Sequence, residues 1–388
     1  MIFKSFRPLA NTFCAPAAIV LIALLGGCSV VGGLFSSSAK KPQPAELQPV
    51  VALVPARQVW SARIGEVAFP LQMTVAGETV VVASSDGTVA ALETRSGRDR
   101  WRVNVGAPIA AGVGSDGKLA AVVTRSNEVV ALDNGREIWR QKLAAQAFSS
   151  PFVAGGRIFV LAADRSVNAF DGQTGRKLWT QQRPSEPLVL RQSGVMLAVG
   201  DTLVVGLAGR LSGLNPLNGS IRWEAPIASP RGINDVERLV DLVGSVSRVG
   251  NTVCARAFQA SVGCVDAQRG TLLWTKPANG AQGLDGDDRL VFGTEADGRV
   301  IAWLRSDGEN AWSTDNLRYR SLGAPLVVGR SIVIGDSAGF LHLLSRADGS
   351  VLNRLSTDGS AVAAAPVLSG NTLIAATRSG TVFGFAPE

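Results

Sequence analysis

The chain has 388 residues, of which 46% are hydrophobic, and it carries a formal net charge of +7. This length exceeds the size at which one hydrophobic core usually stops growing, so the sequence predicts several domains or a repeat. The single histidine, His342, disfavours zinc hydrolases and Ser-His-Asp enzymes, and we expect it to be a packed or solvated strand residue. Runs of Lys and Arg do not exceed two residues, which argues against nucleic-acid binding.

The first 27 residues have the order of a secretory signal, because Lys4 and Arg7 precede the apolar run Cys14–Leu25. That run is too short to span a bilayer comfortably. It leads into LGGC, ending at Cys28, which resembles the lipobox of bacterial lipoproteins. The resemblance implies cleavage after residue 27 and acylation of Cys28 with palmitate-like chains. Ser29 then implies the outer membrane, with the protein facing the periplasm. A signal whose cysteine is incidental is the alternative.

Residues 28–55 are predicted to be a flexible tether that begins at the lipidated cysteine. Ser29–Val50 is rich in Ser, Gly, Pro and Lys and shows no clear period. The remaining residues, 56–388, contain no further stretch long and apolar enough to cross a membrane. We therefore expect a soluble body on a tether.

A signature with Gly four residues before Trp recurs through the body, as in DGQTGRKLW (Asp171–Trp179). Six copies end at Trp101, Trp139, Trp179, Trp223, Trp274 and Trp312. Trp60 precedes the series, Asn353 stands where an eighth tryptophan would be, and Trp303 is off the pattern. The spacing of about forty residues is typical of propeller repeats.

Each period predicts four short antiparallel strands. In TVVVASSDGTVAALETRSGRDRW, for example, two alternating apolar runs meet at Asp86-Gly87, and a glycine turn leads into the Trp strand. Units of this kind are blades of an all-β propeller, and the count gives eight. The final residues, 365–388, supply only three strands. We therefore expect Ala56–Gly65 to complete the last blade and close the ring, since a seven-bladed ring would leave two unpaired edges.

The tryptophan in the signature has a structural explanation. A Trp side chain buries about 150–250 Å², and at equivalent positions around a ring it can pack into the seams between neighbouring blades. The preceding glycine provides a turn with positive φ. The signature thus indicates a fold and not an activity.

Segments such as DGQTGRKLW, DNGREIW and AQRGTLLW resemble the repeats of pyrroloquinoline-quinone (PQQ) dehydrogenases, which are eight-bladed. Those enzymes are typically longer, and their site uses calcium with carboxylate ligands, an aspartate base and usually an adjacent cysteine pair. This chain has no Cys-Cys pair, and its acidic residues lie mostly at turns.

The lipobox, the tether and about 330 residues of such repeats together resemble the BamB family, the lipoprotein subunit of the outer-membrane β-barrel assembly (BAM) complex. The resemblance covers the whole chain. It implies a non-enzymatic scaffold with no cofactor and no metal, which binds the periplasmic part of BamA and assists the folding and insertion of unfolded outer-membrane proteins. The alternatives are a PQQ-dependent dehydrogenase-like enzyme and a propeller that binds a polysaccharide or a peptide in its central funnel.

Functional residues are expected where the repeat is interrupted, because the blades are scaffold. Two loops qualify: Arg183–Gly194, and an insertion at Pro226–Ser245 that either docks a partner or packs its own apolar residues. By motif position, the resemblance assigns partner binding to Leu188, Leu190, Arg191 and Asp241. Val243 departs from the family pattern, because a second acidic residue often stands there.

Two cysteines remain in the body, Cys254 and Cys264, ten residues apart across a predicted hairpin turn. On paired strands they would face each other, and in an oxidising periplasm they would form a structural disulfide. Two buried thiols that fill the blade interior are the alternative.

Overall fold

The computed structural model describes residues 42–182, 188–230, 233–234 and 238–388. The chain divides into two units, Met1–Gln43 and Pro44–Glu388. The predicted signal peptide, Cys28 and the first part of the expected tether lie outside the described residues. Within the described ranges the regular elements are all strands, and we find no helix there that could span a membrane.

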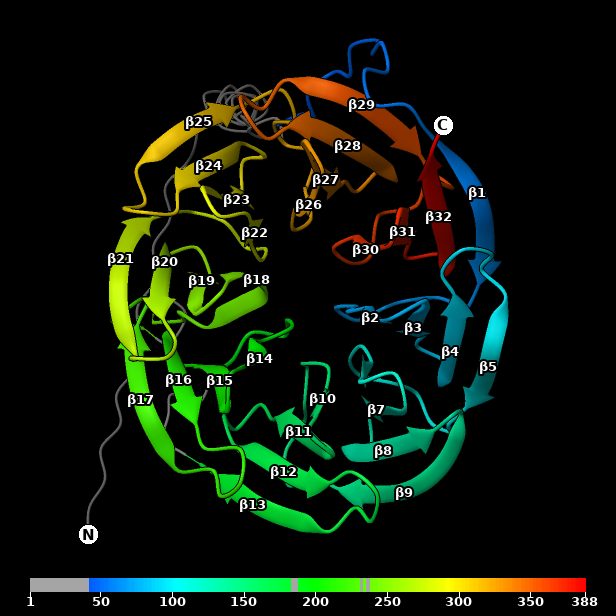
Figure 1. Cartoon of the computed structure of the whole chain (residues 1–388), viewed down its shortest axis with the longest axis vertical. Coiled ribbons are helices and arrows are strands. Elements are labelled where there is room, and N and C mark those ends of the chain that lie inside the picture. The colour runs from blue at the N-terminus through cyan, green and yellow to red at the C-terminus, as the bar shows by residue number, and fades with distance from the viewer. Residues whose placement is uncertain (1–41, 183–187, 231–232, 235–237) are drawn as a thin grey trace, which may run out of the picture. The chain divides into compact units, whose positions relative to one another are not determined.

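The second unit is the predicted eight-bladed propeller (Figure 1). Blade 1 contains β2 (Thr74–Ala76), β3 (Thr79–Ala83), β4 (Thr88–Glu93) and β5 (Asp99–Asn104). Blade 2 contains β6 (Gly114–Ser115), β7 (Leu119–Val123), β8 (Glu128–Asp133) and β9 (Arg136–Lys142). Blade 3 contains β10 (Phe152–Ala154), β11 (Arg157–Leu161), β12 (Val167–Asp171) and β13 (Lys177–Gln181). Blade 4 contains β14 (Met196–Val199), β15 (Thr202–Leu207), β16 (Arg210–Leu214) and β17 (Ile221–Pro226).

The other four blades follow the same antiparallel order. Blade 5 contains β18 (Leu242–Val249), β19 (Thr252–Ala257), β20 (Ser261–Asp266) and β21 (Thr271–Pro277). Blade 6 contains β22 (Asp285–Gly286), β23 (Leu290–Thr294), β24 (Val300–Leu304) and β25 (Asn310–Thr314). Blade 7 contains β26 (Leu326–Val328), β27 (Ser331–Gly335), β28 (Phe340–Ser345) and β29 (Val351–Ser356). Blade 8 contains β30 (Val367–Ser369), β31 (Thr372–Ala376), β32 (Thr381–Pro387) and β1 (Ala56–Arg63).

The N-terminal strand closes the ring as predicted. β1 pairs antiparallel with β32, in a register that runs from Ala56 opposite Pro387 to Arg63 opposite Thr381. Seven blades are therefore continuous in sequence, and the eighth joins the two ends of the described chain.

The hydrophobic pattern explains the position of each strand within its blade. The second strands β3 and β7 are buried along their whole length, because neighbouring blades cover both of their faces. Fourth strands such as β5 alternate between exposed and half-buried residues, because they form the outer edge of a blade. The core is thus a ring of continuous apolar runs with an alternating outer layer.

Each signature tryptophan packs on the signature glycine of the following blade. The ring of Trp139 lies against Gly175, where an added Cβ would come within 2.6 Å of Trp139 Cδ2, and Gly175 has φ +71°. The indole of Trp139 also donates a hydrogen bond to Gly172 O at 2.9 Å. The same contact repeats from Trp60 on Gly97 to Trp312 on Gly349. The repeated signature therefore joins neighbouring blades and requires glycine for both conformation and space.

The seam between blades 7 and 8 is built differently. Here Asn353 takes the place of tryptophan, and its side-chain amide donates to Val54 O at 2.9 Å. The segment Ala45–Val54, which we call the strap, lies along blade 7. Its main chain makes six hydrogen bonds with the blade 6–7 loop and with blade 7: Ala45 N to Arg318 O, Leu53 N to Leu352 O, Arg320 to Ala45 O, Arg354 to Gln48 O, Arg330 to Leu53 O, and Asn353 to Val54 O. The last part of the segment expected as a tether is thus held on the propeller.

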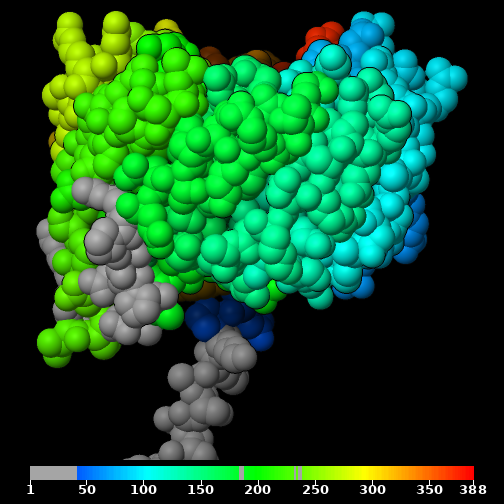
Figure 2. Space-filling model, turned by 90° about the horizontal axis from the view of Figure 1, so that it is seen from below, coloured from blue at the N-terminus to red at the C-terminus, as the bar shows by residue number. Residues whose placement is uncertain are grey.

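The connections between successive blades lie on one rim of the ring, together with the turns between second and third strands. We call this the loop rim. The strap begins there, because Ala45 bonds to Arg318 in the loop between β25 and β26. In Figure 2 the dark-blue start of the described chain shows at the lower rim of the ring.

Candidate docking surface

The sequence-predicted docking residues meet on the loop rim of blades 3 to 5. Leu188, Leu190 and Arg191 belong to the connection between β13 and β14, and Asp241 ends the connection between β17 and β18. A further residue, Arg165, enters from the turn between β11 and β12. We call these five residues the docking surface.

The docking surface is held together by one carboxylate and one guanidinium. Asp241 Oδ2 accepts a hydrogen bond from Leu190 N at 3.0 Å. Asp241 Oδ1 lies 3.1 Å from Arg165 Nη2, which also donates to Leu188 O at 2.9 Å. The pair therefore fixes the main chain on both sides of Val189.

Leu188 and Arg191 are the exposed members of this surface. The Leu188 side chain is 39% exposed, and the Arg191 guanidinium lies 5.7 Å from the ring centroid of Phe148. Leu190 is half-buried and lines a cavity of about 50 Å³ beneath the loop, together with Phe148 and Asp241. Neither leucine is buried inside a blade, so the loop is more than the entry to a strand.

The carboxylate of Asp241 points toward the loop that carries Leu188 and Leu190, and not toward solvent. Its side chain is only 18% exposed, and both carboxylate oxygens bond within the chain. Val243, where the family often has a second acid, is buried in β18. In this geometry the acidic half of the predicted site holds the apolar half in place.

Sequence reasoning missed Arg165, although the repeat contains a signal for it. In the equivalent turns of blades 1, 6, 7 and 8 the positive-φ position is occupied by Gly87, Gly298, Gly339 and Gly380. Blade 2 has Asn127 there, with φ +61°, and blade 3 has Arg165, with φ +62°. An arginine in place of the repeat's glycine adopts a strained conformation, which is a reason to look for a specific role.

The remaining part of the Pro226–Ser245 insertion divides between surface and core. Ile233 is fully exposed, whereas Leu242 is buried as the first residue of β18. Val236 lies outside the described residues. The insertion therefore contributes Asp241 to the docking surface while its end packs into blade 5.

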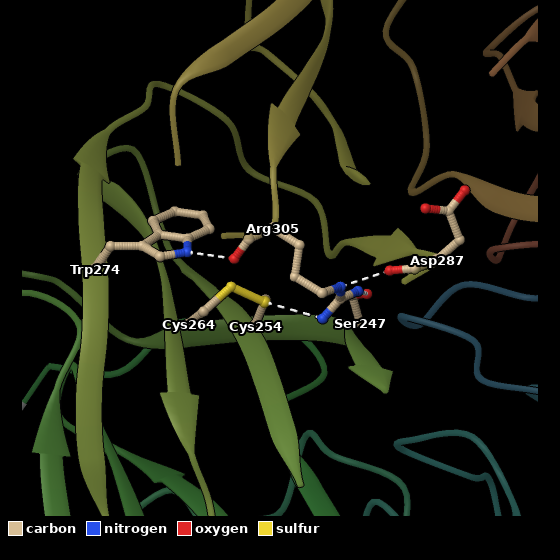
Figure 3. Close-up of a disulfide and its surroundings, with 6 residues drawn as sticks. All are labelled: Ser247, Cys254, Cys264, Trp274, Asp287 and Arg305. Carbon is tan, nitrogen blue, oxygen red and sulfur yellow. Dashed lines mark hydrogen bonds between the residues drawn. A yellow bond between two sulfur atoms is a disulfide. The ribbon is translucent and has the colours of Figure 1, made fainter. Parts of the chain in front are cut away.

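Cys254 and Cys264 are directly opposed on β19 and β20, and the structure joins them in a disulfide with a Cα–Cα distance of 3.9 Å (Figure 3). Arg305, which follows β24 of the next blade, donates to Cys254 Sγ at 3.3 Å and to Ser247 Oγ. Its own carbonyl accepts from the Trp274 indole at 2.8 Å. The disulfide is thus part of the seam between blades 5 and 6, fully buried and remote from solvent.

The central channel holds a cavity of about 610 Å³ at the loop rim, lined mainly by small or apolar residues. Arg191, Asp285 and Arg378 are its charged residues. Burial raises the pKa of Asp285, although the carboxylate accepts hydrogen bonds from Val327 N and Gly286 N. In the ranges that the structure describes, no group of three or more His, Cys, Asp or Glu residues is placed to hold a metal ion.

Comparison with known proteins gives one consistent family. A family model described as outer membrane protein assembly factor BamB matches residues 48–103 and 85–314. The outer membrane protein assembly factor BamB of Burkholderia pseudomallei is 38% identical over 387 residues, covering 98% of this chain and 99% of that protein. The crystal structure of BamB from Moraxella catarrhalis superposes with a TM-score of 0.77 at 24% identity, over 85% of this chain and 99% of that one.

The fold alone is shared more widely. The quinohemoprotein alcohol dehydrogenase of Comamonas testosteroni has a TM-score of 0.66 at 15% identity, covering 88% of this chain and 78% of that one. At that level of identity the similarity concerns the propeller and not the chemistry.

Proposed function

Because this chain belongs to the BamB family of outer membrane protein assembly factors, we propose that it is a non-enzymatic scaffold that binds the periplasmic part of BamA and assists the folding and insertion of β-barrel outer-membrane proteins. The observation that carries the BamA contact is the docking surface. It presents an exposed leucine and, three residues later, an exposed arginine, on a loop that the Arg165–Asp241 pair holds. Such a small apolar anchor with a charged neighbour has the composition of an interface hot spot.

The test compares docking variants with an exposed leucine elsewhere. We expect Leu188→Ala with Leu190→Ala, or Arg191→Glu alone, to abolish co-purification of the soluble propeller with the periplasmic part of BamA. Each truncated anchor costs about 1–2 kcal/mol of binding, so the double variant weakens association by tens- to hundreds-fold. Leu217→Ala, in the turn before β17 on the opposite rim and 65% exposed, is the matched control and should bind normally. Wild-type affinity in the folded double variant would place the BamA contact elsewhere on the ring.

We also propose that Cys28 carries the lipid anchor, which attaches the protein to the outer membrane with its propeller in the periplasm. The support is the LGGC motif followed by Ser29. Cys28→Ser should release the protein from the membrane fraction, and a variant that stays with the outer membrane in high salt would refute the anchor. The absence of catalysis has its own test. Purified protein given calcium, PQQ and an oxidisable alcohol or sugar as electron donor should reduce no redox dye above the rate without protein, and cofactor-dependent dye reduction would show an enzyme.

A further inference from the structure

We infer that Arg165 is the positioning residue of the docking surface, and that Asp241 acts on the partner only through the loop that the two residues hold. This inference rests on the proposed function for the identity of the partner. The clamp itself is a property of the free protein and is tested separately below.

The first support is the conformation of Arg165. Its φ of +62° lies in the left-handed region, which disfavours residues other than Gly, Asn and Asp. The backbone of this turn matches the glycine turns of other blades: Arg165 N bonds to Ala162 O, as Gly298 N bonds to Glu295 O. Glycine would therefore build the same turn without strain, so the contacts of the arginine side chain are the place to look for a role beyond the turn.

The second support is where that side chain goes. Arg165 is 7% exposed overall, so it is not a solvated surface charge. Its Nη2 reaches both Leu188 O and Asp241 Oδ1, residues that the sequence places 23 and 76 positions away. One guanidinium from blade 3 thereby links the two loops that flank blade 4.

The third support is that the two carboxylate oxygens of Asp241 have different partners. One carboxylate oxygen meets Arg165, and the other accepts from Leu190 N. The carboxylate thus connects the guanidinium to the amide on the far side of Val189. This arrangement holds Leu188 and Arg191 in a single presentation before a partner arrives, which lowers the ordering cost of binding.

The decisive variant gives blade 3 the residue that other blades have. Arg165→Gly keeps the turn and removes the clamp, and Arg165→Asn does the same with the residue found in blade 2. We expect the thermal transition to stay within a few degrees of wild type while affinity for the periplasmic part of BamA falls roughly ten-fold or more. Asn127→Gly, at the same turn position of blade 2, is the matched control and should leave affinity unchanged. Unchanged affinity in both folded Arg165 variants would overturn the inference.

Two further measurements separate positioning from direct contact. The affinity losses of Arg165→Gly and Asp241→Ala should not add, because both remove the same clamp, whereas additive losses would show that Asp241 contacts the partner itself. In the free protein, amide exchange at Leu190 should accelerate in Arg165→Gly while the exchange of blade amides is unchanged; equal Leu190 protection would refute the clamp. If wild-type protein failed to bind BamA, the proposed function would fail, and the exchange result would still decide the clamp.

Discussion

The repeat is interrupted in two regions, the seam between blades 7 and 8 and the docking surface of blades 3 to 5, and both use arginine to hold irregular main chain. At the closing seam, Arg320, Arg330 and Arg354 all donate to carbonyls of the strap. At the docking surface, Arg165 donates to the carbonyl of Leu188. Both regions therefore use arginine-to-carbonyl hydrogen bonds, with three such arginines on the strap.

The difference lies in what surrounds the arginines. The strap continues into β1, which pairs along its length with β32, and Val54 packs against the apolar core of blades 7 and 8. The docking loop instead leaves Leu188 exposed above a small cavity. The closing seam is thus part of the cooperative fold, while the docking surface is a locally held segment that can change without unfolding the ring.

Removal of the strap should have the largest effect on stability. A soluble chain that begins at Pro55 loses six hydrogen bonds that a chain beginning at Pro44 retains. At about 0.5–1.5 kcal/mol each, the free energy of unfolding should fall by roughly 3–9 kcal/mol, measured from denaturant midpoints at constant m. Binding to BamA by the folded fraction should persist. Equal midpoints for the two chains would mean that the strap rests on blade 7 without stabilising it.

The seam between blades 2 and 3, which has the usual Trp–Gly contact, provides the reference for the seam that the strap closes. Gly175→Ala introduces a Cβ against the Trp139 ring at φ +71°, whereas Gly156→Ala in the same blade has nearly the same φ, +70°, and nothing within 4 Å. Both variants incur about 1–2 kcal/mol of backbone strain, and only Gly175→Ala adds overpacking of about 1–3 kcal/mol. Thermal unfolding of the two proteins measures the difference. Equal losses would show that conformation alone, and not the Trp contact, requires the signature glycine.

The disulfide should contribute to stability without contributing to docking, although Asp241 leads directly into its blade. Cys254→Ala with Cys264→Ala should lower the free energy of unfolding by about 2–3 kcal/mol, as expected for a short closed loop, and leave BamA affinity unchanged. Non-reducing mass analysis of the periplasmic protein should find the two cysteines linked. Two free thiols in that sample would refute the bridge.

The repeat made the fold predictable, because its information is local. The spacing of Trp101, Trp139 and their equivalents gave the number of blades, and the three-strand remainder at the C-terminus gave the ring closure that β1 confirms. The strap was not predictable, since its bonds use main-chain carbonyls that composition does not encode. Arg165 was missed because its role depends on two loops brought together only by the ring, although its position in the repeat marked it.

The smallest expected effect is on the pH dependence of stability, through buried polar groups that connect blade 7 to the strap. Asp336 Oδ2 accepts from Arg320 Nε at 2.8 Å and lies 3.0 Å from His342 Nε2, so a buried chain of polar groups links blade 7 to the arginine that holds Ala45. Burial lowers the pKa of His342, although the hydrogen bond to Asp336 opposes this, and Arg354 and Arg320 lower it further. Burial would raise the pKa of Asp336, but hydrogen bonds from His342, Phe340 N and Arg320 lower it to about 2.

Both shifts make the native state less stable in acid, in separate ranges. Because the pKa of His342 is lower in the fold than the ordinary histidine pKa of 6.5, the unfolded chain takes up this proton first as the pH falls. The His342 contribution is therefore complete above that pH and decreases below it. The Asp336 contribution is complete above about pH 4 and is lost as the pH falls through about 2.

Denaturant midpoints of His342→Gln should therefore depend less on pH than those of wild type just below pH 6.5. The same comparison in chains that begin at Pro55 tests whether the strap shares this dependence. Parallel curves for the wild type and His342→Gln would exclude His342 as the titrating group.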